Sequence, residues 1–117
     1  MIKILWLDDL RNPFLDIEGR VPKETGEIHW VLNYEQFVQW IQKFGLPDII
    51  SFDHDLGDKE RFFIPEIQEM TGKDCANWLV EYCMDNNLEL PKYYVHSANP
   101  VGADNIIGLL QNFKNKR

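Results

Sequence analysis

Three polar clusters in the sequence combine side chains that bind hard metal ions with side chains that transfer protons. Each follows a short apolar run, and the three are Asp8-Asp9, Asp53-His54-Asp55 and His96-Ser97. Carboxylate oxygens are the ligands that Mg²⁺ and Mn²⁺ prefer. Imidazole groups serve as general acids and bases near neutral pH. Brought together, these clusters could perform metal-assisted chemistry on a phosphate group.

Asp8, Asp9 and Asp53 are the candidate metal ligands. Each acidic position alone is also what a strand shows where it leaves the core for solvent. The two positions together are harder to explain in that way, because adjacent parallel strands would bring the carboxylates within several ångströms of each other. Like charges at that range repel unless a cation lies among them. The sequence therefore predicts a site for Mg²⁺ or Mn²⁺.

His54 and His96 are the candidate acid and base, since both would lie at strand ends beside acids or a hydroxyl group. Asp55 could orient either imidazole. Arg11 could form an ion pair with Asp55, or it could hold a phosphate oxygen in a bidentate contact. His29 stands at the start of a predicted strand without such neighbours, and we interpret it as structural.

The segment 97–102 is predicted to be a turn that precedes the last helix. The free N–H groups of that helix start would point toward the same end of the sheet and could bind an anion. Ser97, Asn99 and Gly102 are the residues of this turn that we expect to contact phosphate. Ordinary helix capping by serine or asparagine is the alternative interpretation.

The elements that must position these residues alternate along the chain. Apolar runs predict strands at residues 2–7, 28–32, 48–52 and 93–96, and apolar residues at helical spacing predict helices at 34–44, 73–86 and 103–113. Residues 10–27 and 56–71 are predicted to be loops, because glycine and proline interrupt them. Strands that alternate with helices imply a parallel sheet with right-handed crossovers. Ligands bind such sheets at the carboxyl ends of the strands.

Composition narrows the class of protein. The 117 residues suit one α/β domain, 1–117, and carry 12 basic and 19 acidic side chains for a net charge of −7. This acidic balance disfavours binding to duplex DNA. The chain shows no signal peptide and no apolar run long enough to span a membrane. Cys75 and Cys83 are too far apart on a helix for a disulfide and are expected in the core, which fits a cytoplasmic protein.

Four stretches of the sequence together resemble one known family. They are LDDLRNP at 7–13, SFDHDLG at 51–57, GKDCANWL at 72–79 and HSANPVGADNI at 96–106. In this combination and order the chain resembles the cyclic-phosphate processing receiver domain family. The resemblance implies a truncated receiver-like fold, which is a flavodoxin-like, Rossmannoid, three-layer domain with a parallel sheet of about four strands.

The resemblance also implies a role for each cluster. Asp8, Asp9 and Asp53 would hold the metal, and Asp53 would occupy the phosphoacceptor-like position. The remaining expected site residues are the catalytic His54, His96 and Asp55 and the substrate-binding Arg11, Ser97, Asn99 and Gly102. We expect a metal-dependent phosphoesterase that processes a cyclic phosphate, with a 2′,3′-cyclic RNA end as one such substrate.

Two alternatives stay open for the function. One is a non-catalytic module that binds a nucleotide or a protein through the same end of the sheet. The other is a stand-alone receiver that is phosphorylated on Asp53. A signalling receiver carries a fifth strand with a lysine, which the sequence does not predict here, so phosphorylation-driven switching is not expected.

Overall fold

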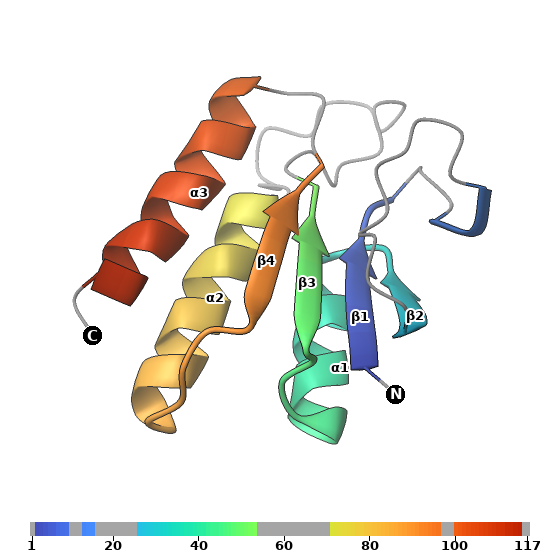
Figure 1. Cartoon of the computed structure of the whole chain (residues 1–117), viewed down its shortest axis with the longest axis horizontal. Helices are drawn as coiled ribbons and strands as arrows, with labels where there is room; N and C mark the ends of the chain where they lie inside the picture. The colour runs from blue at the N-terminus through green and yellow to red at the C-terminus, as the bar shows by residue number, and fades with distance from the viewer. Residues whose placement is uncertain (1, 10–12, 16–25, 54–70, 97–99, 116–117) are drawn as a thin grey trace, which may run out of the picture.

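The structure is a computed structural model that describes residues 2–9, 13–15, 26–53, 71–96 and 100–115 (Figure 1). Its elements in chain order are β1 (Ile2–Leu7), a 3₁₀ helix (Pro13–Leu15), β2 (Gly26–Val31), α1 (Tyr34–Phe44), β3 (Ile49–Phe52), α2 (Gly72–Asp85), β4 (Lys92–Val95) and α3 (Pro100–Asn115). The alternation of strands and helices predicted from the apolar pattern is confirmed.

The four described strands form one parallel sheet in the order β2-β1-β3-β4. This order matches the first four positions of the flavodoxin-like sheet. The predicted α/β class and the predicted parallel sheet of four strands are therefore confirmed. All four strands point in the same direction in Figure 1, so their carboxyl ends meet at one edge of the sheet.

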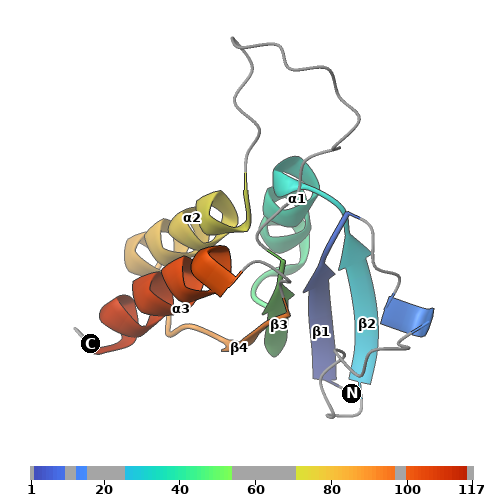
Figure 2. The same cartoon turned by 90° about the horizontal axis from the view of Figure 1, so that it is seen from above.

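The three described α-helices pack on the same face of the sheet (Figure 2), so the described elements form two layers and not the three layers that the resemblance implied. The crossovers that contain α1 and α2 both advance toward β4, so crossovers of the same hand place both helices on one face. One buried apolar core joins this face to the helices; it comprises Leu5, Leu7, Val31, Ile50 and Phe52 of the sheet and Phe37, Ile41, Cys75, Ala76, Leu79, Cys83, Ile106, Leu110 and Phe113 of the helices. Among the described residues, no helix has the length and apolar character needed to cross a membrane.

The opposite face of the sheet carries a second set of buried side chains. Ile4, Trp6 and Ile49 are each buried and do not belong to the core beneath the helices. Because side chains alternate between the two faces of a strand, Asp8 lies on the same face as Trp6, and Asp53 lies on the same face as Ile49. The acidic residues thus continue the apolar strip on this second face.

The boundaries of α1 illustrate how local chemistry sets an element. Asn33 precedes the helix, and its Oδ1 accepts a hydrogen bond from the Gln36 N–H at 2.9 Å. The Gln36 side chain accepts in turn from the N–H of Leu32. Gly45 ends the helix with φ of 83°, a left-handed conformation that favours glycine. The predicted helix at 34–44 has the same bounds in the structure.

Several sequence-based boundaries differ from the structure by one to three residues, and two of these differences have a clear physical reason. The loop predicted to extend through residue 27 ends earlier, because Gly26 already pairs with Ile2 in β2. A Cβ atom at position 26 would lie 2.5 Å from the carbonyl oxygen of Ile2, so this glycine permits close strand approach instead of a turn. The turn predicted through Gly102 also ends earlier, because α3 begins at Pro100. Proline is favoured in the first helical turn, where its missing N–H is not needed.

Neither cysteine forms a disulfide and both are buried, as expected from their spacing. Burial, with a further contribution from the Asp74 carboxylate, raises the pKa of the Cys75 thiol well above its usual range. The folded protein therefore keeps a proton at Cys75 at pH values where the unfolded chain loses it.

We expect this difference to reduce stability at alkaline pH. Above the ordinary thiol pKa of about 8.5, the free energy of unfolding should fall by up to about 1.4 kcal/mol per pH unit because of Cys75. Urea denaturation of the wild type and of Cys75→Ala between neutral and alkaline pH measures the effect. The variant should show a shallower alkaline loss, and identical slopes would contradict the assignment.

Candidate functional site

Asp8, Asp53 and His96 form a row across the carboxyl ends of three neighbouring strands. Each is the first residue beyond its strand, and each backbone N–H is held by the strand beside it. Asp8 N donates to the Val31 carbonyl oxygen at 3.1 Å, Asp53 N to that of Leu7 at 3.0 Å, and His96 N to that of Phe52 at 2.9 Å. The sheet ladder itself therefore aligns the three side chains.

Asp8, Asp9 and Asp53, here called the acidic row, have the composition of a site for a hard divalent cation. Asp8, Asp9 and Asp53 each offer a carboxylate oxygen, and these oxygens lie within 4.8 Å of one another. Asp8 is fully buried and Asp53 is 4% exposed. Buried carboxylates this close together repel and lack the screening of water, so a cation among them would relieve both costs. The donor set fits Mg²⁺ or Mn²⁺, as predicted from the sequence.

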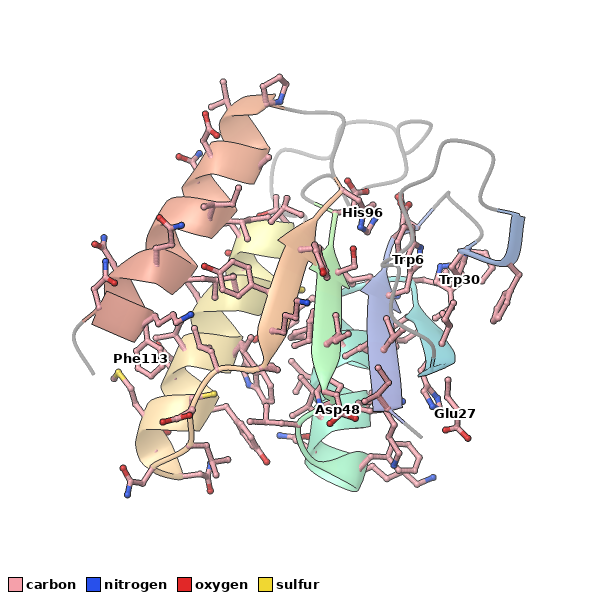
Figure 3. The ribbon with its side chains drawn as sticks, viewed as in Figure 1. Trp6, Glu27, Trp30, Asp48, His96 and Phe113 are labelled. Carbon is pink, nitrogen blue, oxygen red and sulfur yellow. The ribbon has the colours of Figure 1, made fainter. Side chains whose placement is uncertain are left out.

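Contacts with Asp8, Ser51 and Trp6 hold His96 inside the site. Its Nε2 lies 3.0 Å from Oδ2 of Asp8, and its Nδ1 lies 2.7 Å from Oγ of Ser51. Its ring stacks on Trp6, with ring centroids 3.8 Å apart and planes 5° from parallel. Figure 3 shows His96 and Trp6 close together at the carboxyl end of the sheet.

The contacts of His96 determine where its protons lie. A carboxylate only accepts hydrogen bonds, so Nε2 carries the proton that is shared with Asp8. Ser51, His96 and Asp8 form a hydrogen-bonded chain of the residue types found in serine hydrolases. Ser51 is fully buried, however, so its hydroxyl cannot reach a substrate as a nucleophile. The chain instead connects the interior of the sheet to the acidic row.

Trp30 of β2, the strand on the other side of β1 from β3, fixes the carboxyl end of β1. Its indole Nε1 donates to the backbone carbonyl oxygen of Asp8 at 2.7 Å. Trp6 and Trp30 are paired in the register of β1 and β2. Together the two tryptophans hold the point at which the chain leaves β1 and where the acidic pair begins.

The predicted site residues fall into three groups in the structure. Asp8, Asp9, Asp53 and His96 are brought together, and Gly102 lies buried in the first turn of α3. Five predicted residues lie outside the described part of the chain, and their roles stay predictions: Arg11, His54, Asp55, Ser97 and Asn99.

Trp6, Ser51 and Trp30 were not predicted as site residues from the sequence. Trp6 stands two residues before Asp8, and Ser51 stands two residues before Asp53. Because strand side chains repeat their direction every second residue, these positions share a face with the acids. That two-residue offset was the available signal, although it does not reveal which ring or hydroxyl makes contact.

A separate cleft lies at the other end of the sheet. It has a volume of about 670 Å³ and is lined by Glu89, Leu90, Pro91, Lys92, Tyr93, Phe113 and Lys114. Parallel sheets bind ligands at the carboxyl ends of their strands, whereas this cleft lies at the start of β4 and the end of α3. It has no carboxylate cluster, so the acidic row is the better candidate for chemistry.

A flavodoxin-like strand order with an acidic row at the carboxyl ends of β1 and β3 defines a receiver-type domain. A family model for the cyclic-phosphate processing receiver domain matches residues 3–112. The chain therefore belongs to the cyclic-phosphate processing receiver domain family, as the sequence resemblance implied. No curated protein sequence matches the chain significantly.

Solved structures similar to this chain show likeness of fold alone. One contains amino acids 181–211 of the yeast Spc42 trimeric coiled coil in a fusion protein; it has a TM-score of 0.57 and 21% identity over 92% of this chain. The chain spans only 61% of that fusion protein. The signal receiver domain of a putative LuxO repressor protein from Vibrio parahaemolyticus has a TM-score of 0.48 and 16% identity, with 98% of this chain and 94% of that chain covered.

Divalent metal should stabilise the protein through the acidic row. A ligand that binds only the folded state at about 100 times its Kd adds roughly 2.7 kcal/mol to the free energy of unfolding. Mg²⁺ or Mn²⁺ should therefore raise the melting temperature, and the double change Asp8→Asn, Asp9→Asn should abolish that rise. Asp85→Asn, at an exposed acid at the end of α2, is the matched control and should respond like the wild type. A wild-type melting temperature indifferent to millimolar Mg²⁺ and Mn²⁺ would refute the metal site.

Removing one acid should stabilise the metal-free protein. Two unit charges 4 Å apart repel by about 1 kcal/mol even in water, and burial makes the repulsion stronger. We expect Asp53→Asn to be at least as stable as the wild type in a chelating buffer, by urea denaturation. A loss of several kcal/mol would instead identify Asp53 as a structural partner in a buried ion pair.

Proposed function

We propose that this protein is a metal-dependent phosphoesterase that opens a cyclic phosphate, and that a 2′,3′-cyclic phosphate at an RNA end is the first substrate to test. The observation that carries the proposal is the buried row of Asp8 and Asp53, with Asp9 beside it, at the carboxyl ends of β1 and β3. Membership of a family named for cyclic-phosphate processing supports the same substrate class.

The proposed reaction is hydrolysis of one ring ester bond. The oxygen of water bonds to phosphorus, one P–O bond of the ring breaks, and the released alkoxide takes a proton. The product is a phosphomonoester beside a free hydroxyl group. A divalent cation on Asp8, Asp9 and Asp53 would supply Lewis-acid stabilisation of the charge that develops on the phosphoryl oxygens.

His54 is the residue we propose for proton transfer in this reaction. It directly follows Asp53 in the sequence, and Asp55 beside it could orient its ring. His96 was predicted for the same work, but both of its ring nitrogens already contact protein groups. A proton-transfer group must reach the substrate within hydrogen-bond distance, so the contacts of His96 count against that role, and we assign it to His54.

Phosphate binding is proposed for the residues around the start of α3. This helix has 16 residues, and it begins at the same end of the sheet as the acidic row (Figure 1). The positive end of a helix dipole and its free N–H groups favour a phosphate oxygen. Ser97, Asn99 and Gly102, together with Arg11, remain the predicted phosphate contacts.

A screen of cyclic and linear phosphates with Mg²⁺ or Mn²⁺ tests the proposal. We expect turnover of a cyclic phosphate that a chelator removes. His54→Gln should lower kcat by roughly two to four orders of magnitude, which is the usual contribution of an acid or base. The control His29→Gln lies in the middle of β2, where its ring contacts Glu27 and Trp40, and it should leave turnover at the wild-type level.

The outcomes of this screen also separate the alternatives. Binding of a cyclic phosphate without turnover would indicate a non-catalytic nucleotide-binding module. Asp53 follows β3 beside the acidic pair, so phosphorylation of Asp53 is the second candidate function. Incubation with a small phosphodonor should then add one phosphoryl group to the intact mass, and Asp53→Asn should not gain it.

A further inference from the structure

The environment of His96 is more restrictive than proton transfer requires. The residue is 7% exposed, its ring lies flat on Trp6, and both nitrogens have protein partners. A histidine that exchanges protons with a substrate needs one nitrogen directed at that substrate. His96 would have to break its contact with Asp8 or with Ser51 to offer one.

The contact with Asp8 ties His96 to the acidic row. Asp8 and Asp53 follow neighbouring strands, and His96 follows the strand beyond Asp53. The Nε2–H group meets Oδ2 of Asp8, so one oxygen of this carboxylate is engaged within the protein. The same contact therefore also sets the direction of the other oxygen, Oδ1, relative to a cation in the acidic row.

We propose that His96 is a positioning residue that fixes the rotation of the Asp8 carboxylate for metal binding. Ser51 and Trp6 are the two residues that hold the imidazole in place for this task. The inference rests on the metal site of the proposed function, but it does not depend on catalysis. Partners that orient a metal ligand typically contribute 10–100-fold to metal affinity or activity.

Trp6 and Ser51 restrict different motions of the His96 imidazole ring. The stack on Trp6 restricts the tilt of the imidazole, because the two planes are only 5° from parallel. The Ser51 hydroxyl at 2.7 Å restricts rotation about the ring axis and selects which nitrogen faces Asp8. Trp6 and Ser51 are themselves buried in β1 and β3. Because the sheet fixes these two residues, it also fixes His96 and, through it, the Asp8 carboxylate.

Two substitutions at position 96 separate positioning from proton transfer. His96→Gln keeps an N–H donor near the position of Nε2, and His96→Phe keeps a ring over Trp6 but removes the donor. The measured quantity is the Kd for Mn²⁺ of the full chain, without substrate. We expect His96→Phe to weaken Mn²⁺ binding by roughly 10–100-fold. His96→Gln should retain most of the affinity, and the control His29→Gln should bind like the wild type.

Ser51→Ala is the second test, in case His96→Phe does not fold. It leaves the histidine in place but removes the hydroxyl that fixes Nδ1, so Mn²⁺ binding should weaken without loss of the fold. Long-range ¹H–¹⁵N spectra of the metal-free wild type should show the His96 proton on Nε2, and Ser51→Ala should disturb this state. A wild-type ring without a proton on Nε2 would overturn the proposal.

The remaining outcomes distinguish this inference from the proposed function. If no cyclic phosphate is turned over but the Mn²⁺ affinities follow the expected order, the positioning role stands and the catalytic proposal fails. If His96→Gln and His96→Phe both bind Mn²⁺ like the wild type, the positioning role is overturned, whatever the turnover. A wild type that binds no Mn²⁺ overturns the positioning role together with the metal site.

Discussion

The parallel register of β1, β3 and β4 is the constraint on which the candidate site depends. The same ladder that pairs Leu7 with Phe52 places Asp8 beside Asp53 and sets His96 next in the row. A slip of one residue would turn every side chain of a strand to the other face. Such a slip would expose the apolar core and carry an acid into it. The burial of the core beneath the helices therefore also fixes the positions of the carboxylates.

The two faces of the sheet have different roles. The face beneath the helices carries the larger apolar core and supplies the main hydrophobic stabilisation. The other face is buried and apolar at Ile4 and Ile49, and its buried polar side chains lie toward the carboxyl ends of the strands. Trp6 stands at the transition, because it is buried with the apolar residues while its ring supports His96. The site is thus the polar end of a buried strip, where charges interact more strongly than they would in water.

Sequence patterns predicted the parts of the structure that depend on local chemistry. The apolar spacing and Gly45 gave the bounds of α1, and the acids after two apolar runs gave the row. Gly26 misled the loop prediction, because a glycine that permits strand approach looks like a turn residue until its partner Ile2 is known. The contacts of His96 were equally inaccessible. Ser51 and Trp6 come from two different strands, so their meeting with His96 depends on register and not on spacing along the chain.

An imidazole suits the task of holding Asp8 for a reason of charge. Lysine or arginine at position 96 would also donate to the carboxylate, but each would bring a fixed positive charge into the acidic row. That charge would cancel part of the field that attracts a divalent cation. An imidazole can donate one N–H to Asp8 while accepting from Ser51, and in that form it adds no net charge. The buried network can therefore orient the acids without competing with the metal that would balance them.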